Sequence, residues 1–449
     1  MESSRDELPI LPERPIDRVL DPLIHFMHIE AMGGIVLIVA TAVALYLANS
    51  SASGAFLAFW KTPVGIQFGT FQFRYSLHHM IDDGLMVIFF FVIGLEVKRE
   101  LVLGELRGLR RAALPLMGAI GGMVVPAGIY LLLQVGKPAA RGWGIPMATD
   151  IAFVVGCMAV LGPRIPRGLR VMLLSLAIAD DIGAILIIAV GYAHGLNLFW
   201  LSMGLLGFVV VFALSWLGVR SFGIYVLCSI AIWFAFHESG IHATIAGVIL
   251  GLMTPAHSRI DEAGANRILE RCKAIIKKMD WRTESNRVER VRRHRKISRE
   301  LVSPLEYLIN ALHPWVSFVI MPLFALANAG VPIRMGDLRS SVALAVVCGL
   351  CLGKPLGIFL ATLCAVKTGL SQLPEGVTWP HVIGGGMLAG IGFTMALFIA
   401  ALALDGGLLD TAKVGVLMAS LISALVGVAI LLLSSRSTAG NSKMEAKET

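Results

Sequence analysis

Charged residues are scarce in this sequence. Only 15% of its 449 residues are Asp, Glu, Lys or Arg, whereas 56% are hydrophobic. A soluble domain of this length has no use for so much apolar surface, and the mean hydropathy of +0.78 excludes that class. We therefore expect an all-α polytopic membrane protein whose main partner is the lipid bilayer.

Cysteine is also rare, and its six copies are scattered along the chain. Cys348 and Cys351 form a CxxC motif, but no second pair and no nearby histidine accompanies them. We interpret this pair as helix packing rather than as a metal or redox site. The scattered cysteines therefore indicate no cofactor.

Two further absences restrict the function. The chain has no GxxxxGK[ST] motif, so ATP is not expected to drive it and an ion gradient must do so. The first 30 residues are polar and lack the apolar stretch of a signal peptide. We therefore expect a cytoplasmic N-terminus. We also expect a transporter with no cofactor and no enzymatic activity.

Apolar stretches long enough to cross a bilayer predict about twelve transmembrane helices. They lie at 33–50, 84–97, 113–134, 143–161, 171–192, 198–217, 222–236, 240–254, 304–328, 340–366, 379–404 and 411–434. Several of them are short or are interrupted by glycine. Such stretches are typical of discontinuous helices that line a cavity.

The distribution of Lys and Arg predicts the orientation. Thirty of these residues fall on the side that holds both termini and seven on the other, so the first side is cytoplasmic. The resulting segments are a cytoplasmic N-terminal segment (1–32), helices 1–8 (33–254), a basic cytoplasmic loop (255–303), helices 9–12 (304–435) and a disordered cytoplasmic tail (436–449). We attribute the basic loop to topology and anionic lipid, and we expect no nucleic acid as a partner.

Two adjacent aspartates, Asp180 and Asp181, lie in the middle of the apolar stretch VMLLSLAIADDIGAILIIAVGY (171–192). Lys354 is the one basic residue in the middle of a predicted helix. Charges at such depth are costly and usually functional. Because adjacent helical residues point about 100° apart, one aspartate can line a cavity while the other faces a neighbouring helix. Lys354 is the natural partner for one carboxylate.

Carboxylates suit both a hard metal cation and protons. A buried pair near a lysine titrates as a coupled unit, so cation and protons compete for one site. That competition is what ion exchange requires.

Two of the predicted helices are interrupted. In 143–161 the interruption is at Pro146, Thr149 and Asp150, and in 379–404 it is at a run of glycines. Each is the second of three consecutive spans, which predicts two inverted-topology repeats with discontinuous helices that cross at a site between them. Partial charges at the facing half-helix ends suit compensation by Asp150 and Lys354.

Eight motifs in family order make the chain resemble the NhaA-type sodium/proton antiporters. They are GLEVKREL (94–101), TDIAF (149–153), LAIADDIGAILIIA (176–189), SGIHATIAGVI (239–249), HPWV (313–316), MPLFALANAGV (321–331), GKPLGI (353–358) and LAGIGFTMALFIA (388–400). The resemblance covers roughly residues 30–435.

The resemblance implies a role for each matching residue. Asp181 would be the principal sodium ligand, and Asp180 would share cation and proton binding and pair with Lys354. Thr149 and Asp150 would lie at the crossing, opposite the break at Gly390, Gly392 and Thr394. A cytoplasmic funnel and pH response would involve a further set of residues: Asp83, Glu96, Lys98, Arg99, Glu100 and His242.

The chain departs from the family where a pH-sensing acid and histidine are common. Those positions hold Ile309 and Asn310, with Glu306 one turn away. The basic loop is also longer than the resemblance leads us to expect. Both departures concern the pH response and not the exchange itself.

The implied function is secondary active exchange of intracellular sodium or lithium for external protons across the bacterial inner membrane. It would be electrogenic, work by alternating access and serve pH and sodium homeostasis. One oligomeric state that we consider is a homodimer. A cation channel is an alternative that needs no proton-titrating site. An intramembrane aspartyl protease is another, but it requires aspartates on different helices and a GxGD motif, which the chain lacks.

Overall fold

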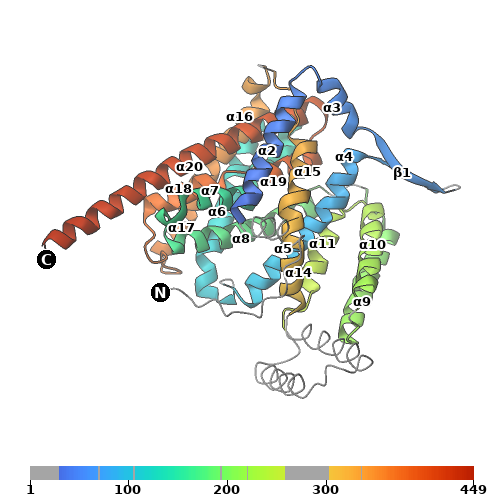
Figure 1. Cartoon of the computed structure of the whole chain (residues 1–449), viewed down its shortest axis with the longest axis horizontal. Coiled ribbons are helices and arrows are strands. Elements are labelled where there is room, and N and C mark those ends of the chain that lie inside the picture. The colour runs from blue at the N-terminus through green and yellow to red at the C-terminus, as the bar shows by residue number, and fades with distance from the viewer. Residues whose placement is uncertain are drawn as a thin grey trace, which may run out of the picture.

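The computed structural model describes residues 30–68, 71–104, 107–192, 195–219, 221–257, 303–334 and 336–448. Within them the chain is almost entirely helical, with one β-hairpin (Figure 1). Most of the predicted N-terminal segment and most of the basic loop lie outside the described residues.

The first part of the chain, up to residue 257, contains the hairpin and the helices up to α11. Its helices and strands are α2 (Glu30–Ala48), α3 (Ser53–Trp60), β1 (Pro63–Phe68), β2 (Phe71–Ser76), α4 (Leu77–His79), the π-helical η1 (Met80–Leu85), α5 (Met86–Val102), α6 (Leu109–Gln134), the 3₁₀ segment η3 (Pro138–Met147), α7 (Ile151–Leu161), η4 (Gly162–Arg164), α8 (Arg167–Gly191), α9 (Leu198–Trp216), α10 (Phe222–Ser239) and α11 (Thr244–Met253).

The second part, from residue 303, is entirely helical in its regular elements. They are α14 (Pro304–Trp315), the π-helical η5 (Val316–Ile320), α15 (Met321–Asn328), η6 (Asp337–Arg339), α16 (Ser341–Cys348), the π-helical η7 (Gly349–Gly353), α17 (Lys354–Lys367), α18 (Trp379–Ala389), α19 (Phe393–Ala403) and α20 (Gly406–Glu448).

Each of the twelve predicted apolar stretches corresponds to helix, which confirms the fold class. By length and hydropathy, seven helices of the described chain can cross a membrane, or up to ten if each bent pair is one span. The predicted number of twelve is not confirmed, because α5 and α11 have only 17 and 10 residues. Large apolar side chains such as Val190 and Trp216 are more than four-fifths exposed, a surface that lipid would cover.

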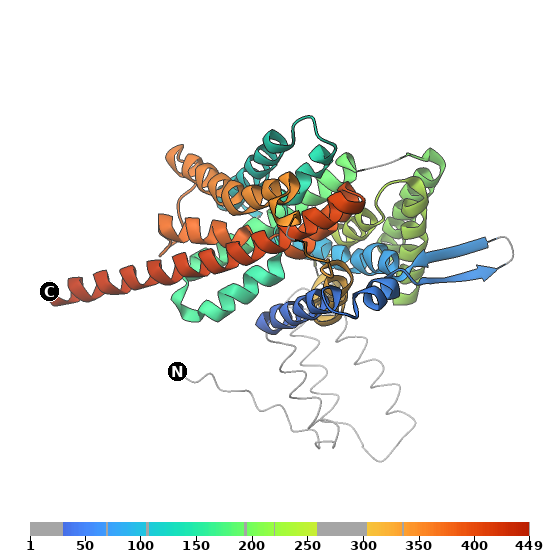
Figure 2. The ribbon, with the colours of Figure 1, turned by 90° about the horizontal axis from the view of Figure 1, so that it is seen from above.

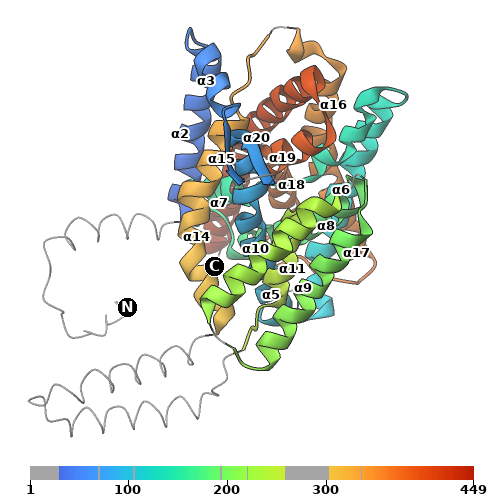
Figure 3. The same ribbon diagram turned by 90° about the vertical axis from the view of Figure 1, so that its right-hand side faces the viewer.

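The body of the molecule surrounds the two broken spans. Figures 1 and 3 place α7 and α19 in the middle of the helices, whereas α9 and α10 form a pair at one side. The β1–β2 hairpin is antiparallel, from the pair Pro63–Ser76 to the pair Phe68–Phe71. It projects from the end of the molecule at which α4 begins (Figure 2).

Small residues allow several helices to pack closely. A Cβ added to Gly121 of α6 would lie 2.2 Å from the carbonyl oxygen of Gly357 in α17. Similarly, a Cβ on Gly247 of α11 would lie 2.5 Å from the carbonyl oxygen of Val87 in α5. Such close backbone contact compensates for the absence of a hydrophobic driving force between helices in lipid.

The C-terminal end differs from our expectation of a disordered tail over 436–449. The structure continues α20 as helix through Glu448. This stretch contains Ala, Met, Lys and Glu, which favour helix, and it has no proline to end one.

Candidate ion-exchange site

The two broken spans satisfy each other's backbone where they cross. The helix pairs η3/α7 and α18/α19 bend by 41° and 47° at their breaks. The backbone N–H of Asp150 in the first break donates to the carbonyl oxygen of Ile391 in the second, at 2.7 Å. Unwound backbone at membrane depth requires such internal partners.

The Asp150 carboxylate caps the N-termini of both half-helices. Its Oδ1 accepts the backbone N–H of Phe153 in α7 at 3.2 Å. Its Oδ2 accepts the backbone N–H and the hydroxyl of Thr394 in α19, at 3.0 and 2.5 Å. One buried negative charge therefore faces two positive helix ends.

Gly390 and Gly392 are required by space rather than by backbone conformation, since both have negative φ values. A Cβ on Gly390 would lie 2.6 Å from the carbonyl oxygen of Leu350 and 2.7 Å from Oγ of Ser423. A Cβ on Gly392 would lie 3.2 Å from the carbonyl oxygen of Ala148 in the opposite break. Glycine thus allows the two breaks to approach.

We expect Gly390→Ala to destabilise the crossing by about 1–3 kcal/mol and to slow exchange, because the new methyl group overpacks a rigid carbonyl. The matched control is Gly128→Ala in α6, where an added Cβ meets nothing within 4 Å. Melting temperatures of the purified variants test this. Equal melting temperatures for Gly390→Ala and the unsubstituted chain would contradict the close packing.

Asp180 lies within α8 and is held by two partners. Its Oδ2 accepts the Thr149 hydroxyl at 2.6 Å and lies 2.6 Å from Nζ of Lys354. The Thr149 hydroxyl also lies 3.1 Å from the carbonyl oxygen of Ala389. Because this hydroxyl has one proton, it can donate to only one of the two at a time.

Lys354 is fully buried and begins α17, immediately after the π-helical η7. Its ammonium also donates to the carbonyl oxygen of Met147, the last residue of η3. It therefore contacts both Asp180 and the C-terminal end of a half-helix, where a positive charge is favourable. Its ion pair is with Asp180, which resolves the choice that the residues alone left open.

Asp181 is as buried as Asp180. Among the described residues, Oδ1 of Asp180 and Oδ1 of Asp181 have no hydrogen-bond partner. Asp181 interacts electrostatically with Asp180, Asp150 and Glu96, and with Lys354 as the one cation. The described residues thus leave one oxygen of each buried carboxylate without a hydrogen bond.

The predicted funnel residues do not form one cluster. Glu96, Lys98, Arg99 and Glu100 share the second half of α5, and Glu96 lies 3.9 Å from Nε2 of His313. Asp83 lies 13 residues earlier, in η1, which continues into α5, so it is about 20 Å away at 1.5 Å per residue. At that distance the side chains of Asp83 and Glu96 do not contact each other.

His242 and Ile309 lie beside apolar side chains. His242 lies between α10 and α11, with its ring 6.4 Å from that of Phe398 in α19. Ile309, one of the two residues at which we expect the chain to depart from the family's pH sensor, packs in an apolar cluster with Leu95 and Leu305. This cluster adjoins Glu96 along α5.

Sequence reasoning missed a polar network near the hairpin. Asp82 accepts from Nδ2 of Asn328 at 2.7 Å and lies 3.1 Å from Nδ1 of His78. Lys413, also buried, lies 3.3 Å from Oδ1 of Asn328. The spacing of His78 and Asp82 at i and i+4 was a detectable signal. No feature of the sequence indicated that Asn328 of α15 and Lys413 of α20 would join them.

Comparison with known proteins shows the family of this chain. The family model described as Na+/H+ antiporter 1 matches residues 24–431. A Na(+)/H(+) antiporter NhaA from Rhodopirellula baltica is 54% identical, over 94% of this chain and 96% of its own. One from Rhizobium meliloti is 52% identical, over 96% of this chain and 99% of its own.

A solved structure of a sodium proton antiporter from Methanocaldococcus jannaschii aligns with a TM-score of 0.49 and 11% identity, over 92% of this chain and 98% of its own. The family match and the two curated relatives each extend over nearly the whole length of the chain. The chain belongs to the Na+/H+ antiporter 1 family.

Proposed function

We propose that this chain exchanges sodium for protons at Asp180 and Asp181 by alternating access. The observation that supports this most is the pair of unpaired Oδ1 atoms on two fully buried, adjacent aspartates. A buried carboxylate oxygen without a partner is costly in a folded protein. A bound proton or a bound cation removes that cost, and the two exclude each other.

The aspartates have different tasks. Asp180 is held through Oδ2 by Lys354 and Thr149, so only its Oδ1 is available to an ion. Asp181 has no such contact with a lysine of the described residues, so in this proposal it is the main sodium ligand and the main proton acceptor. Lithium, a smaller hard cation, suits the same oxygen ligands.

The exchange is electrogenic in this proposal, because more than one titratable group responds to one sodium ion. Sodium binding at Asp181 increases the positive charge near Lys354, which weakens the ammonium's hold on its own proton. Protons therefore leave from a coupled cluster. A transmembrane potential imposed with potassium and valinomycin should change the exchange rate.

The half-helices at the crossing are the part that moves during alternating access in this proposal. Each break is held by a few hydrogen bonds to the other, at Asp150, Ile391 and Thr394. A change of charge at Asp180 acts directly on Thr149, the residue before Asp150. Ion binding is thereby linked to the geometry of the crossing, and small tilts of the half-helices open the site to one side and then the other.

We further propose that both termini face the cytoplasm of a bacterial cell and that the protein lies in the inner membrane. The excess of Lys and Arg on the side of the termini supports this orientation. The β1–β2 hairpin then faces outward. Intracellular sodium enters from the side of Glu96, and protons from outside drive its export.

Everted membrane vesicles with a pH-gradient dye test the exchange. After respiration has acidified the vesicle interior, addition of sodium should restore the dye fluorescence, and addition of potassium should not. If sodium gives no response in vesicles that contain the folded protein, the proposal is wrong.

Competition between sodium and protons predicts a pH dependence. As pH falls, the sodium concentration for half-maximal exchange should rise, by about tenfold per pH unit for each competing proton, because mass action favours the protonated site. The maximal rate at saturating sodium should change far less. A half-maximal concentration that is independent of pH would show that the two ions use separate sites.

A further inference from the structure

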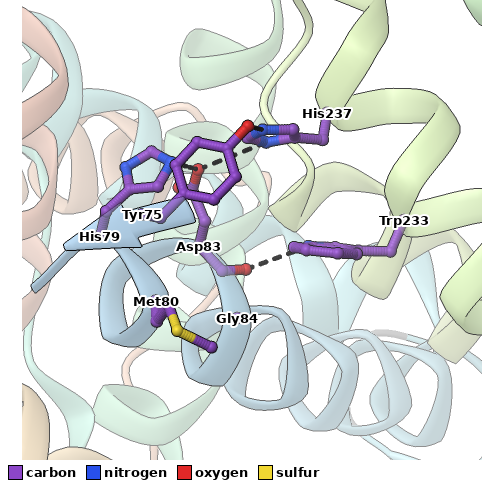
Figure 4. Close-up of a pocket in the computed structure, with 7 residues that line it drawn as sticks. All are labelled: Tyr75, His79, Met80, Asp83, Gly84, Trp233 and His237. Atoms are coloured by element: carbon purple, nitrogen blue, oxygen red, sulfur yellow. Dashed lines mark hydrogen bonds and ion pairs between the residues drawn. The ribbon is translucent and has the colours of Figure 1, made fainter. Parts of the chain in front are cut away.

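Three side chains at the hairpin end of the molecule converge on one point. They are His79 from α4, Asp83 from η1 and His237 from the last turn of α10. One ligand atom from each lies within 4.8 Å of the other two. Figure 4 shows the Asp83 carboxylate between the two imidazole rings, in a small open pocket that Tyr75 and Trp233 also line.

We propose that this cluster is a binding site for a divalent transition-metal ion of the zinc class, with His79, Asp83 and His237 as ligands. Two imidazoles and one carboxylate are ligands that zinc accepts in proteins, with the fourth position left to water. The site is distinct from the aspartate pair in α8 and does not depend on the exchange activity.

Two of the three distances between ligand atoms are close to those around a tetrahedral ion. Nε2 of His79 lies 3.2 Å from Oδ2 of Asp83, and Nδ1 of His237 lies 3.6 Å from the same oxygen. Two ligand atoms bonded to one tetrahedral zinc ion are about 3.3 Å apart, given bond lengths near 2.0 Å. Modest side-chain rotation would therefore bring all three atoms into bonding distance of a single ion.

Hydrogen bonding around the cluster also favours a metal. Nε2 of His79 is buried and has no well-aligned hydrogen bond to any described residue, although it faces Asp83. His237 directs its other ring nitrogen, Nε2, to the hydroxyl of Tyr75 at 3.0 Å. A ligating histidine almost always has such a partner for its second nitrogen, because the partner fixes the tautomer and the ring orientation.

Neighbouring residues fix the cluster from both sides. The indole of Trp233 donates to the backbone carbonyl of Asp83 at 3.2 Å, and its ring stacks on His237 at 5.7 Å. The ring of Tyr75 stacks on that of His79 at 4.8 Å. Ligands whose rotamers are held in place lose less entropy when an ion binds. A bound ion would connect α4 and η1 to α10.

Zinc titration of the purified full-length chain tests the proposal. The protein should carry no histidine tag and should first be stripped with a chelator. Calorimetry should show one tight zinc equivalent that excess magnesium or calcium does not displace. X-ray absorption should show nitrogen and oxygen neighbours near 2.0 Å and no sulfur.

Variants assign the site. His237→Gln and His79→Gln should each abolish the tight equivalent, and the matched control His257→Gln, at an exposed histidine, should retain it. Tyr75→Phe keeps all three ligands and should weaken zinc binding by about 10–100-fold. The His79 side chain is 41% exposed, so His79→Gln should still fold. It therefore tests zinc binding even if His237→Gln does not fold.

Three results would overturn the proposal. They are no tight zinc equivalent in the unsubstituted chain, an equivalent that persists in both His79→Gln and His237→Gln, or sulfur in the first coordination shell. Each outcome is independent of sodium/proton exchange, which is measured in vesicles after chelator treatment.

Discussion

Asp181→Asn is expected to reduce sodium/proton exchange to the rate of empty vesicles while the protein remains folded. The amide cannot bind or release a proton at physiological pH, and it offers a cation a neutral oxygen instead of a charged one. Because Oδ1 of Asp181 has no hydrogen-bond partner within the described part of the chain, the fold does not rely on it. Dye dequenching in everted vesicles measures the loss.

The control for this variant is Asp405→Asn, which removes an exposed carboxylate between α19 and α20. It should exchange at the rate of the unsubstituted chain. Melting temperatures of both variants should match that of the unsubstituted chain, so that a loss of exchange is a loss of the site. Full exchange by Asp181→Asn would remove this residue from the mechanism.

Lys354→Met is expected to lower the free energy of unfolding by about 3–5 kcal/mol, because it leaves Asp180 buried without its counter-charge. Adding Asp180→Asn should restore most of that stability, since the double variant has no unpaired charge. The amide oxygen that this second substitution introduces can still accept the Thr149 hydroxyl. Exchange should remain impaired in both.

Thermal unfolding of the single and double variants in detergent measures this coupling as a double-mutant cycle. Additive losses of stability would mean that Lys354 and Asp180 do not interact. Their 2.6 Å contact would then be without energetic consequence.

Much of the candidate site could be predicted because membrane charges are rare. Asp180, Asp181 and Lys354 stood out as ionisable residues deep in apolar stretches, and the structure places all three in one buried region. Pro146 and the glycine run similarly predicted where the two spans break. In each case one local feature of the sequence was incompatible with an ordinary continuous helix.

Contacts between residues that are far apart in the sequence could not be predicted in this way. That Lys354 contacts Asp180, and that Asp150 caps both α7 and α19, depends on how distant helices pack. The resemblance grouped Asp83 with Glu96 in one funnel, yet the two lie 13 residues apart along the helix. His237 gave no signal, since its partners lie about 160 residues earlier in the chain.

Sodium-induced proton release from the purified protein tests the central claim most directly. In weakly buffered detergent solution, sodium chloride should acidify the medium as sodium displaces protons from Asp180 and Asp181, and choline chloride should not. The account predicts that the release disappears in Asp181→Asn and persists in Asp405→Asn. Undiminished release from Asp181→Asn, or none from the unsubstituted chain at any pH at which it exchanges, would contradict the account.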